Sequence, residues 1–437
     1  MDDLDPREFL LGLFQQAVAA AHPTRAVSRA LPSLPKGRTI VVGAGKAAAA
    51  MAKAVEDNWS GPLSGLVITR YGHGAPCSKV EVVEAGHPVP DAAGNEAAVR
   101  MLGLVQGLGE DDLVLCLISG GGSSLLALPA PGVTLEDKQV VTRALLKSGA
   151  PISGINCVRK HLSAVKGGRL AVAAAPAQIV SLIISDVPGD DPAVVASGPT
   201  VADATTRQDA QAILAKYDVV VPDSVARWLD DPASETPKPG HPGLARVTNR
   251  IIANAKDALT AAARAAEAEK IHAVILGDAI EGEARHVARD HAAKALACLL
   301  RGRPARPPCV LLSGGETTVT VKGNGRGGRN SEYLLALALS LDHASGISAI
   351  ACDTDGIDGT ESNAGAFIDA ETLERAREGG AHAEAALENN DAYGFFRKLG
   401  DLVTTGPTRT NVNDFRAILI TESRFHASGI GSGVRPL

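Results

Sequence analysis

Short apolar runs alternate with alanine-rich amphipathic stretches along most of the chain, and this alternation constrains the fold more than any other feature. The runs are continuously apolar, which is typical of strands buried on both faces of a sheet. They lie at 39–42, 65–69, 80–84, 113–118, 179–184, 250–252, 272–276, 310–312, 348–351 and 417–420. The helical stretches lie at 7–20, 47–56, 95–106, 135–147, 156–173, 255–268, 284–301 and 331–341. The pattern predicts an α/β fold with mostly parallel, Rossmann-like sheets flanked by helices.

The chain has 437 residues, which exceeds the roughly 250–300 residues at which single cores usually stop growing. The segment 230–242 is rich in proline and poor in apolar residues, which is typical of a linker or a long loop. We therefore predict two α/β domains, residues 1–240 and residues 241–437.

Composition excludes several classes of protein. Aromatic residues make up only 3%, and the net charge is −6, so base stacking and a cationic field for nucleic acid or anionic lipid are both excluded. No apolar run reaches the roughly 20 residues of a membrane span, and the N-terminus is acidic, unlike a signal peptide. The six cysteines are widely spaced and form no CxxC pair, which favours buried thiols in a reducing cytoplasm. We expect a cytoplasmic protein that binds small molecules rather than nucleic acid or membranes, and a homodimer stays open.

The segment Gly43-Ala44-Gly45-Lys46 follows an apolar run and opens an alanine-rich helix. Glycines permit a tight turn, and a helix N-terminus carries about half a positive charge, so the pattern predicts a pocket for phosphate or carboxylate. With Ala48 in the last position, the same residues fit the dinucleotide fingerprint GxGxxA, and Arg70 after the next run is compatible with NADP. A simple strand-to-helix turn with a solvated Lys46 is the structural alternative.

Two serine–glycine motifs follow apolar runs. The first predicts a loop whose N–H and hydroxyl groups suit a nucleotide phosphate, because consecutive glycines cost backbone entropy unless a ligand or another chain segment comes close. It consists of Ser119, Gly120, Gly121, Gly122, Ser123 and Ser124. The second motif has a similar pattern and is a further candidate for phosphate or substrate binding. It consists of Ser313, Gly314, Gly315 and Glu316. A structural turn, or duplication of one fold unit, would also produce this resemblance.

Cationic residues gather in two further segments. On a continuous helix over 156–173, Asn156, Arg159, Ser163 and Lys166 would share one face, which favours an anion-facing surface over a merely solvated one. In the segment 322–332, four glycines and two arginines, Arg326 and Arg329, precede an apolar helix with Asn330 or Gly328 at its N-cap. A mobile glycine loop with guanidinium groups suits neutralisation of phosphate charge in a transition state.

Acidic residues follow two of the apolar runs. Asp190 lies in the segment SDVPGDD, and Asp353 and Asp355 lie in DTDGIDG. Carboxylates on such turns are candidate ligands for Mg²⁺, which needs only one or two from the protein when substrate phosphates supply others. They are equally common as turn-capping residues. No HExxH or triad-like pattern involves the histidines, and His87 and His161 read as structural or peripheral.

Together these segments resemble the type II glycerate kinases, the MOFRL family of glycerate 2-kinases. The resemblance runs in order from about residue 40 to 370 through VVGAGKAAAAMA, AGHPVPD, LISGGGSSLL, NCVRKHLSAVKGGRLA, SLIISDVPGDDPAVVASGPT, LLSGGETTVTVKGNGRGGRNSE and ACDTDGIDGTESNAGAFID. It implies phosphorylation of D-glycerate by ATP and Mg²⁺ at the 2-hydroxyl, giving 2-phosphoglycerate. It also implies two α/β domains with the active site in the cleft between them.

The resemblance assigns Lys46 and Arg326 as the catalytic pair that stabilises charge on the transferred phosphoryl group. Within it, Arg159, Lys166, Arg329 and Asn330 would bind phosphate or the glycerate carboxylate, and the two serine–glycine motifs would hold phosphate. Asp190, Asp353 and Asp355 would orient Mg²⁺ or the acceptor hydroxyl. The segment 406–411, GPTRTN, departs from the family pattern because Arg409 stands where a glycine is expected.

Two other classes of function stay open. Some members of the family are called hydroxypyruvate reductases, and an NAD(P)H-dependent reductase would use Gly43–Ala48 but leave the arginine–glycine loop without a role. A non-catalytic sensor of sugar acids would bind glycerate without consuming ATP, but it would need an effector surface that the sequence does not offer.

Overall fold

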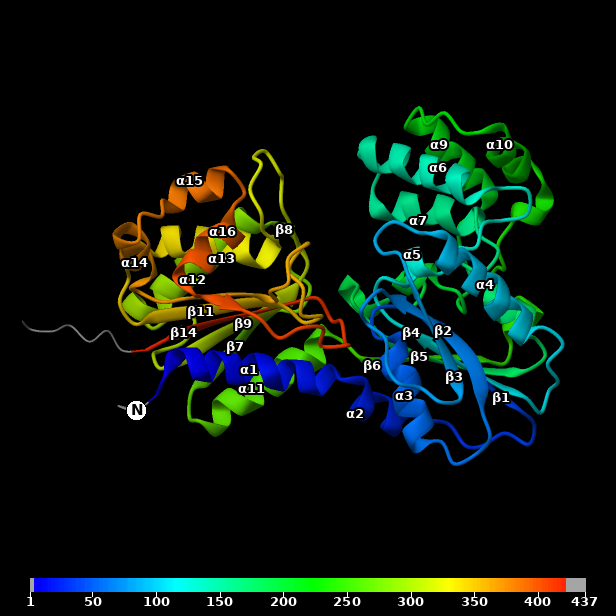
Figure 1. Cartoon of the computed structure of the whole chain (residues 1–437), viewed down its shortest axis with the longest axis horizontal. Coiled ribbons are helices and arrows are strands. Elements are labelled where there is room, and N and C mark those ends of the chain that lie inside the picture. The colour runs from blue at the N-terminus through cyan, green and yellow to red at the C-terminus, as the bar shows by residue number, and fades with distance from the viewer. Residues whose placement is uncertain (1–3, 422–437) are drawn as a thin grey trace, which may run out of the picture. The chain divides into compact units, whose positions relative to one another are not determined.

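The computed structural model describes residues 4–421, which divide into two compact units (Figure 1). The parallel-sheet unit comprises Gln16–Ala258 and Pro407–Asn413. The mixed-sheet unit comprises the described parts of Met1–Gln15 and Asp414–Leu437, together with Leu259–Gly406. The chain passes between the units within helix α1 (Pro6–Ala21) and helix α11 (Ala255–Ala268), and again after Gly406 and after Asn413.

These limits differ from the predicted domain boundary at residue 240, which lies inside the parallel-sheet unit. The proline-rich segment 230–242 is a packed loop rather than a linker. Ser234 is buried, and the Arg169 guanidinium donates hydrogen bonds to the carbonyl oxygens of Ser234 at 2.8 Å and Glu235 at 3.1 Å. Low apolar content predicted the absence of regular structure, but it did not reveal that the backbone carbonyls are anchored by an arginine from another segment.

The parallel-sheet unit is built on six parallel strands in the order β3-β2-β1-β4-β5-β6. The strands are β1 (Thr39–Ala44), β2 (Ser64–Arg70), β3 (Val80–Ala85), β4 (Leu113–Ile118), β5 (Gln178–Ile184) and β6 (Val247–Ala253). The helices are α2 (Pro23–Ala30), α3 (Ala48–Asn58), α4 (Ala92–Val105), α5 (Gly122–Leu125), α6 (Leu135–Lys147), α7 (Ile152–His161), α8 (Arg169–Ala174), α9 (Arg207–Lys216) and α10 (Asp223–Asp230).

The central strands are buried on both faces, as their continuous apolar sequences predicted. Every residue of β1 and β4 is buried. Alternate residues of these strands pack against α4 and α8, where Met101 and Leu170 belong to the same core cluster as Val42 and Cys116. Since β1 and β4 are parallel neighbours, the loops that follow them emerge side by side at one edge of the sheet.

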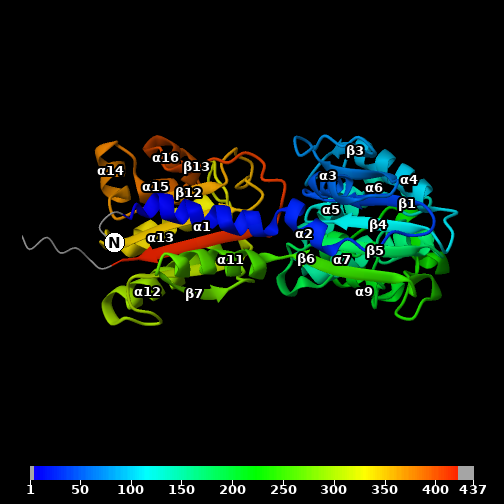
Figure 2. The same ribbon diagram turned by 90° about the horizontal axis from the view of Figure 1, so that it is seen from below.

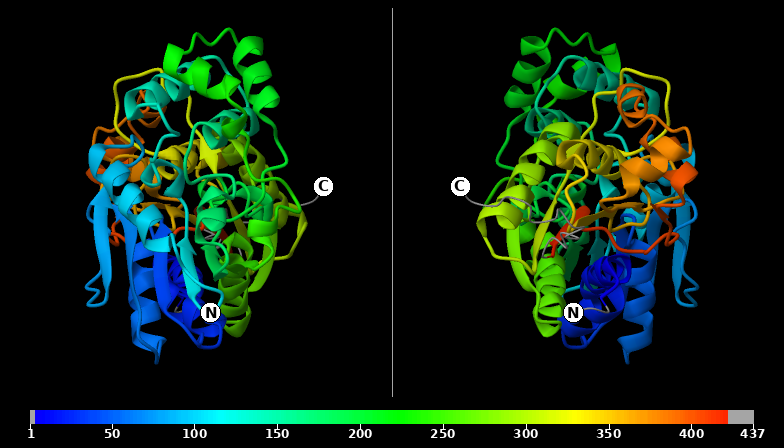
Figure 3. Two further views of the ribbon diagram at one scale, coloured as in Figure 1. Left: turned by 90° about the vertical axis from the view of Figure 1, so that its right-hand side faces the viewer. Right: turned by 90° about the vertical axis from the view of Figure 1, so that its left-hand side faces the viewer.

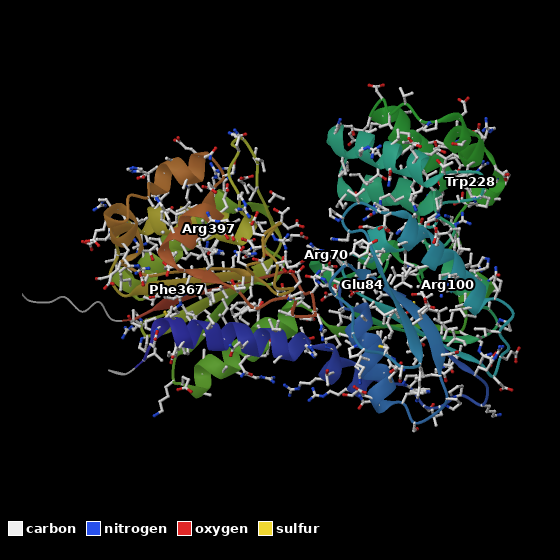
Figure 4. The ribbon with its side chains drawn as sticks, in the orientation of Figure 1. Arg70, Glu84, Arg100, Trp228, Phe367 and Arg397 are labelled. Carbon is white, nitrogen blue, oxygen red and sulfur yellow. The ribbon has the colours of Figure 1, made fainter. Side chains whose placement is uncertain are left out.

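Helices α6, α7, α9 and α10 form a group of their own within this unit, at a distance from its sheet (Figures 1 and 3). Leu145, Val158, Leu214 and Trp228 belong to its separate apolar core. Trp228, labelled in Figure 4, donates a hydrogen bond from its indole Nε1 to the carbonyl oxygen of His161 at 2.7 Å. This bond fixes the C-terminal end of α7, which carries Arg159.

The predicted helix over 156–173 is wrong as a continuous element, because the chain forms α7 and α8 with a turn between them. Gly167 and Gly168 adopt φ values of +57° and +82°, which a right-handed helix does not allow. The Ser163 hydroxyl accepts hydrogen bonds from the N–H groups of Val165 and Lys166, both at 3.3 Å. Arg159 and Lys166 are therefore not placed together by helical periodicity.

The mixed-sheet unit contains a second six-stranded sheet in the order β13-β12-β11-β14-β9-β7 and a two-stranded pair, β10-β8. The strands are β7 (His272–Gly277), β8 (Gly282–Glu283), β9 (Cys309–Gly315), β10 (Thr317–Thr318), β11 (Ile347–Asp353), β12 (Gly365–Ile368), β13 (Leu402–Val403) and β14 (Asp414–Ile420). Beside α1 and α11, its helices are α12 (Ala284–Arg301), α13 (Arg329–Leu341), α14 (Thr372–Glu378), α15 (Ala383–Glu388) and α16 (Ala392–Leu399).

The prediction of mostly parallel sheets is confirmed for the first sheet and wrong for the second. In the second sheet only the β7–β9 pair is parallel, and the other four pairs are antiparallel. Helices α12 and α13 cover one face, and α1 and α11 cover the other (Figures 1 and 2). Phe14 of α1 meets Phe415 of β14 with ring centroids 5.8 Å apart. Because both faces are covered, its strands are as continuously apolar as parallel ones.

The six cysteines are free thiols, in agreement with the prediction that they form no disulfides. Between residues 4 and 421, none of the helices has both the length and the apolar content that crossing a bilayer requires.

Candidate functional site

Two glycine loops meet at the carboxyl edge of the parallel sheet, after β1 and β4. The N–H of Lys46 donates to the carbonyl oxygen of Gly120 at 2.8 Å, and the N–H of Ala47 donates to the Ser119 hydroxyl oxygen at 3.0 Å. The first N–H groups before α3 are therefore bonded to the neighbouring loop. These two N–H groups are therefore not available to an anion, contrary to the backbone pocket predicted at Gly43–Lys46. The Ser119 hydroxyl instead holds the start of α3 against the second loop.

Glycine is required in the second loop because other side chains come very close. A Cβ atom on Gly120 would lie 1.8 Å from a carboxylate oxygen of Asp186 and 2.3 Å from the amide nitrogen of Asn411. Gly121 has φ +80°, and a Cβ there would lie 3.0 Å from the His87 ring and 3.2 Å from Cγ of Lys46. The loop therefore forms a floor over which several polar side chains gather.

Lys46 is partly buried and lies against this floor. His87, read from the sequence as structural or peripheral, lies against the same glycine. The segment 86–91 carries it there from the far end of β3, which follows β2 at the sheet edge. Lys46 and His87 therefore belong to one neighbourhood, a proximity that no sequence spacing indicated.

Asp186, Asn411 and Asn413 complete the same neighbourhood. The Asn411 amide donates to a carboxylate oxygen of Asp186 at 2.9 Å, and the Asn413 amide donates to the backbone carbonyl of Asp186. Residues 407–413 thus lie against the strand edge of a unit far from them in sequence. The sequence signal for Asp186 was its place directly after an apolar strand. Asn411 belongs to the segment GPTRTN, but no sequence spacing indicated that either asparagine contacts Asp186.

Arg409, the residue that departs from the family pattern, is exposed and has φ +62°. This is the left-handed region that favours glycine, which explains why a glycine is expected there. The main effect of an arginine at this position is therefore on backbone conformation, because its side chain is exposed.

Asp190 has a different environment from Asp186. It also has a positive φ, +55°, and its carboxylate accepts a hydrogen bond from the Asn254 amide at 2.6 Å. The pKa of the nearby Asp257 carboxyl is raised, mainly by burial and then by the charge of Asp190. Asp190 is therefore a partly exposed carboxylate near a second acidic group, which is compatible with a cation.

Arg159 and Lys166 come together despite the break in the helix, and Lys138 of α6 joins them. Lys166 is fully buried, and its ammonium donates to the carbonyl oxygen of Ser123 at 2.6 Å. Burial and then the charges of Lys138 and Arg159 lower the pKa of Lys166 well below its usual value. Burial and then Arg159 lower the pKa of Lys138 to about 7. Lys138 was not among the predicted residues, because its position in an ordinary amphipathic helix gives no sequence signal.

In the mixed-sheet unit, Arg326 lies on the loop before α13 with an exposed side chain. Its Nε donates to the Glu361 carboxylate at 3.0 Å, and its guanidinium lies over the Tyr393 ring, 4.9 Å from the centroid. The loop is held rather than free, since the N–H groups of Arg326 and Gly325 donate to Asp391 at 3.0 Å and to Asn389 at 2.9 Å. The sequence-based expectation of a mobile loop is therefore not supported.

Arg329 lies in a network of carboxylates. Its guanidinium donates to Asp414 and Asp353, each at 2.7 Å, and to Glu316 at 2.9 Å. Burial alone would lower the pKa of Arg329, but these carboxylates raise it well above its usual value. With three acidic partners, Arg329 has little capacity left for phosphate, and the geometry favours a structural role over the predicted anion-binding one.

Asn330 is fully buried at the start of α13. The Asp358 carboxylate accepts hydrogen bonds from the N–H groups of Asn330 at 2.9 Å and Ser331 at 2.8 Å, and so caps the helix from a distant segment. Burial raises the pKa of Asp358. The N-cap position belongs to Gly328, one of the two residues predicted for it.

The second serine–glycine motif is part of a strand rather than a loop. Ser313, Gly314 and Gly315 are the last residues of β9 and pair with β14. A Cβ on Gly315 would lie 2.2 Å from the backbone nitrogen of Ile280, so this glycine admits a neighbouring backbone. Strand pairing and the close approach of Ile280 therefore explain why glycines occur here, and nothing in the geometry supports their predicted role in phosphate binding. The Glu316 carboxylate accepts a hydrogen bond from Arg329.

Asp353 and Asp355 lie at the end of β11, both buried. Asp353 accepts from Arg329, and its other oxygen accepts the N–H of Asp355 at 3.0 Å. Among residues 4–421, no three His, Cys, Asp or Glu side chains converge in a metal-binding arrangement. A Mg²⁺ ion held by one or two carboxylates and by substrate phosphates fits this donor set, whereas a site built from protein ligands alone does not.

The predicted residues therefore fall into two groups. One group lies together in the parallel-sheet unit, and the other lies in the mixed-sheet unit. The first consists of Lys46, Ser119, Gly120, Gly121, Gly122, Ser123, Ser124, Arg159, Lys166 and Asp190. The second consists of Ser313, Gly314, Gly315, Glu316, Arg326, Arg329, Asn330, Asp353 and Asp355.

Comparison with known families gives two matches. A model described as "Domain of unknown function (DUF4147)" matches residues 9–230, and the MOFRL family model matches residues 309–414.

Curated relatives match nearly the whole chain. A protein from Agrobacterium vitis, provisionally named a hydroxypyruvate reductase, is 54% identical over 96% of this chain and 95% of its own. The D-glycerate 2-kinase of Thermotoga maritima is 42% identical over 93% of this chain and 97% of its own. The glycerate 2-kinase of Pyrococcus horikoshii is 41% identical over 96% and 99%.

Solved structures agree with these matches. The crystal structure of the glycerate kinase from Thermotoga maritima superposes with a TM-score of 0.87 at 42% identity, covering 95% of this chain and 99% of that one. A protein from Pyrococcus horikoshii OT3 gives a TM-score of 0.81 at 40% identity, covering 97% and 100%.

Proposed function

Since the chain belongs to the glycerate 2-kinase family, we propose that it transfers the γ-phosphoryl group of ATP to the 2-hydroxyl of D-glycerate, giving 2-phosphoglycerate and ADP. The observation that carries the proposal is the gathering of Lys46, Asp186 and two glycine loops at the carboxyl edge of a parallel sheet. Ligands of such sheets bind at this edge. A cation, a carboxylate and closely packed backbone at one place suit a reaction that moves a charged group.

Phosphoryl transfer depends on positioning and charge stabilisation more than on covalent chemistry. In the proposed reaction, Lys46 and Arg326 neutralise charge on the γ-phosphoryl group, and Gly120–Ser124 hold nucleotide phosphate. Asp186 is the nearest described carboxylate to the glycine floor and is suited to orient the acceptor hydroxyl. Lys46 belongs to one compact unit and Arg326 to the other, so their joint action is a prediction about the complete protein.

Magnesium would be held by Asp190, or by Asp353 and Asp355, together with ATP phosphates. When bound, it would neutralise phosphate charge during the transfer. We also propose that the protein works in the reducing cytoplasm, where ATP is available, and the six free cysteines are consistent with this location.

Reduction of hydroxypyruvate with NAD(P)H is the second candidate, because the strand order 3-2-1-4-5-6 is that of dinucleotide-binding sheets. In that fold, N–H groups at the start of the first helix receive the pyrophosphate. Here the N–H groups of Lys46 and Ala47 donate to the neighbouring loop instead. Since these donors are occupied, the geometry favours the kinase.

The test is to incubate the protein with ATP, Mg²⁺ and D-glycerate and to identify the product by phosphorus NMR. We expect 2-phosphoglycerate, and 3-phosphoglycerate would contradict the proposed regiochemistry. A parallel assay with NADPH and hydroxypyruvate follows the absorbance of the reduced cofactor. Steady oxidation of NADPH together with no phosphorylated product would favour the reductase.

A further inference from the structure

Three cationic side chains of the parallel-sheet unit gather without any acidic partner. Lys138 is 7% exposed, Lys166 is fully buried, and Arg159 is partly buried. Their mutual repulsion contributes to the lowered pKa values of both lysines. Among the described residues, no carboxylate forms an ion pair with any of the three, and the two lysines contact carbonyl oxygens instead. The ammonium of Lys138 is 3.5 Å from the carbonyl oxygen of Ala127.

A neighbouring buried lysine, in contrast, has an acidic partner. Lys160, on the same helix as Arg159, pairs with the Asp203 carboxylate at 3.4 Å. Burying a charge without a partner costs several kcal/mol in proteins, so buried charges are normally paired. An unpaired group of three is therefore expected where a ligand supplies the negative charge.

Lys138 and Arg159 line a cavity of about 140 Å³. The cavity is bounded on one side by Pro88, Val89 and Pro90, and no Asp or Glu lines it. Its volume is well below the roughly 300–1,000 Å³ of pockets for drug-sized ligands, and a cavity of about 150 Å³ accepts a six-carbon ring. The space therefore suits a small acid and excludes a nucleotide.

The cavity adjoins the glycine floor of the candidate active site. Ser123 lines it, and the carbonyl oxygen of this residue accepts the hydrogen bond from Lys166. Gly121, two residues earlier, lies against His87 and Lys46. Since consecutive Cα atoms are about 3.8 Å apart, the Cα atoms of Gly121 and Ser123 are at most about 7.6 Å apart, so the cavity adjoins the loop that Lys46 contacts.

We propose that Lys138 and Arg159, supported by the charge of Lys166, form the site that binds the carboxylate of the small hydroxy acid. This inference rests on the proposed function for the identity of the acid. Lys138 would then be a specificity-determining residue that requires a carboxylate on the acceptor. The apolar wall formed by residues 88–90 would limit the acid to a short carbon chain.

The decisive variant is Lys138→Met, which keeps the length of the side chain and removes its charge. Because the charge is unpaired in the free protein, we expect the variant to melt at a higher temperature than the wild type. D-glycerate should raise the melting temperature of the wild type in the absence of ATP and should not raise that of Lys138→Met. In turnover assays we expect KM for D-glycerate to rise at least tenfold and KM for ATP to change less than twofold.

Lys147→Met is the matched control, because Lys147 is an exposed lysine on the same helix. It should leave the D-glycerate-dependent melting shift and both KM values unchanged. Glycerol, which lacks the carboxylate, should give no shift with any of the proteins.

Two results would overturn the proposal: an unchanged glycerate shift in Lys138→Met, or a rise in KM for ATP alone. The melting experiment needs no catalysis. Absence of phosphorylated product would therefore contradict the proposed function, while the glycerate shift and its loss in Lys138→Met would still support the carboxylate site.

Discussion

At the scale of single residues, the chain buries cations in two different ways. Arg329 is surrounded by three carboxylates, whereas Lys138 and Lys166 have only carbonyl oxygens as hydrogen-bond partners within residues 4–421. The first arrangement stabilises the folded chain by itself. The second lowers stability in the free protein and is compensated when an anion binds. The two kinds of site should therefore respond in opposite directions to removal of the cation.

The Lys138 charge gives a pH-dependent prediction for the ligand-free protein. Its pKa is about 7 in the folded chain, mainly because of burial and then Arg159, whereas an unfolded lysine has a pKa near 10.4. Between these values the unfolded chain holds a proton that the folded chain lacks, so the contribution of Lys138 to the free energy of unfolding rises with pH. Lys138→Met should therefore stabilise most at or below pH 7, by a few kcal/mol, and should lose this advantage towards pH 10.

Urea unfolding of wild type and Lys138→Met at a series of pH values measures this difference directly. Comparing the two proteins cancels the buried cysteines, whose raised pKa values also affect stability in alkaline solution. A difference that stays constant from pH 7 to pH 10 would show that Lys138 does not titrate in this range.

Substitution of Arg329 should mainly lower stability, whereas substitution of Arg326, three positions earlier, should mainly lower activity. Arg329→Met leaves the buried Asp353 without its guanidinium partner and leaves Asp414 with Arg416 as its one remaining arginine among the described residues, and the loss of stability should be about 3–5 kcal/mol. Arg326→Met breaks an ion pair whose arginine is 57% exposed, and the loss should be within about 1 kcal/mol. Turnover should fall in Arg326→Met. Urea unfolding and steady-state kinetics on both variants check this contrast, and equal losses of stability would contradict it.

At the scale of elements, hydrophobic periodicity located most of the strands and helices but not their partners. The runs at 113–118 and 417–420 look alike in sequence, yet β4 has parallel neighbours and β14 has antiparallel ones. Burial on both faces produces the same continuous pattern in either arrangement. Direction depends on the connections between strands, which local sequence does not encode.

The glycine pair Gly167-Gly168 ends the helical path between α7 and α8, because both residues have positive φ values. Gly168 has φ +82°, and a Cβ there would lie 3.0 Å from the carbonyl oxygen of Val201. We expect Gly168→Ala to cost about 1–3 kcal/mol of stability because the backbone is strained and space is short. Gly103 of α4 does not have a positive φ, and a Cβ there would meet no other segment within 4 Å, so Gly103→Ala should stabilise by about 0.5–1 kcal/mol. Melting temperatures of the two variants should move in opposite directions.

At the scale of the whole molecule, the sequence predicted which segments carry chemistry better than which atoms do. Lys46 lies among polar groups at the edge of the parallel sheet, and Arg159 lies beside two lysines in the helical group of the same unit. Arg329 and Gly315 were predicted to bind anions. In the structure, carboxylates surround Arg329, and the backbone of Ile280 lies against Gly315. Asn411 and Lys138 reach their partners from distant segments through tertiary packing, so no local pattern could show what they contact.

The catalytic pair provides the prediction that concerns the complete protein. Lys46 and Arg326 lie in different compact units, and the proposal requires both to act on one phosphoryl group. Removal of a single group that stabilises transition-state charge typically lowers kcat by about 10²–10³-fold. We expect Lys46→Met and Arg326→Met each to show a loss of this order with little change in melting temperature.

The double variant decides whether the two charges act together. If they neutralise the same developing charge, the loss in the double variant should be smaller than the product of the single losses, because each charge acts fully only when the other is present. Independent roles, such as nucleotide binding by one and acid binding by the other, would give losses in kcat/KM that multiply. Measuring kcat/KM for D-glycerate in wild type, both single variants and the double variant distinguishes the two cases, and a multiplicative result would separate Lys46 from Arg326 in the mechanism.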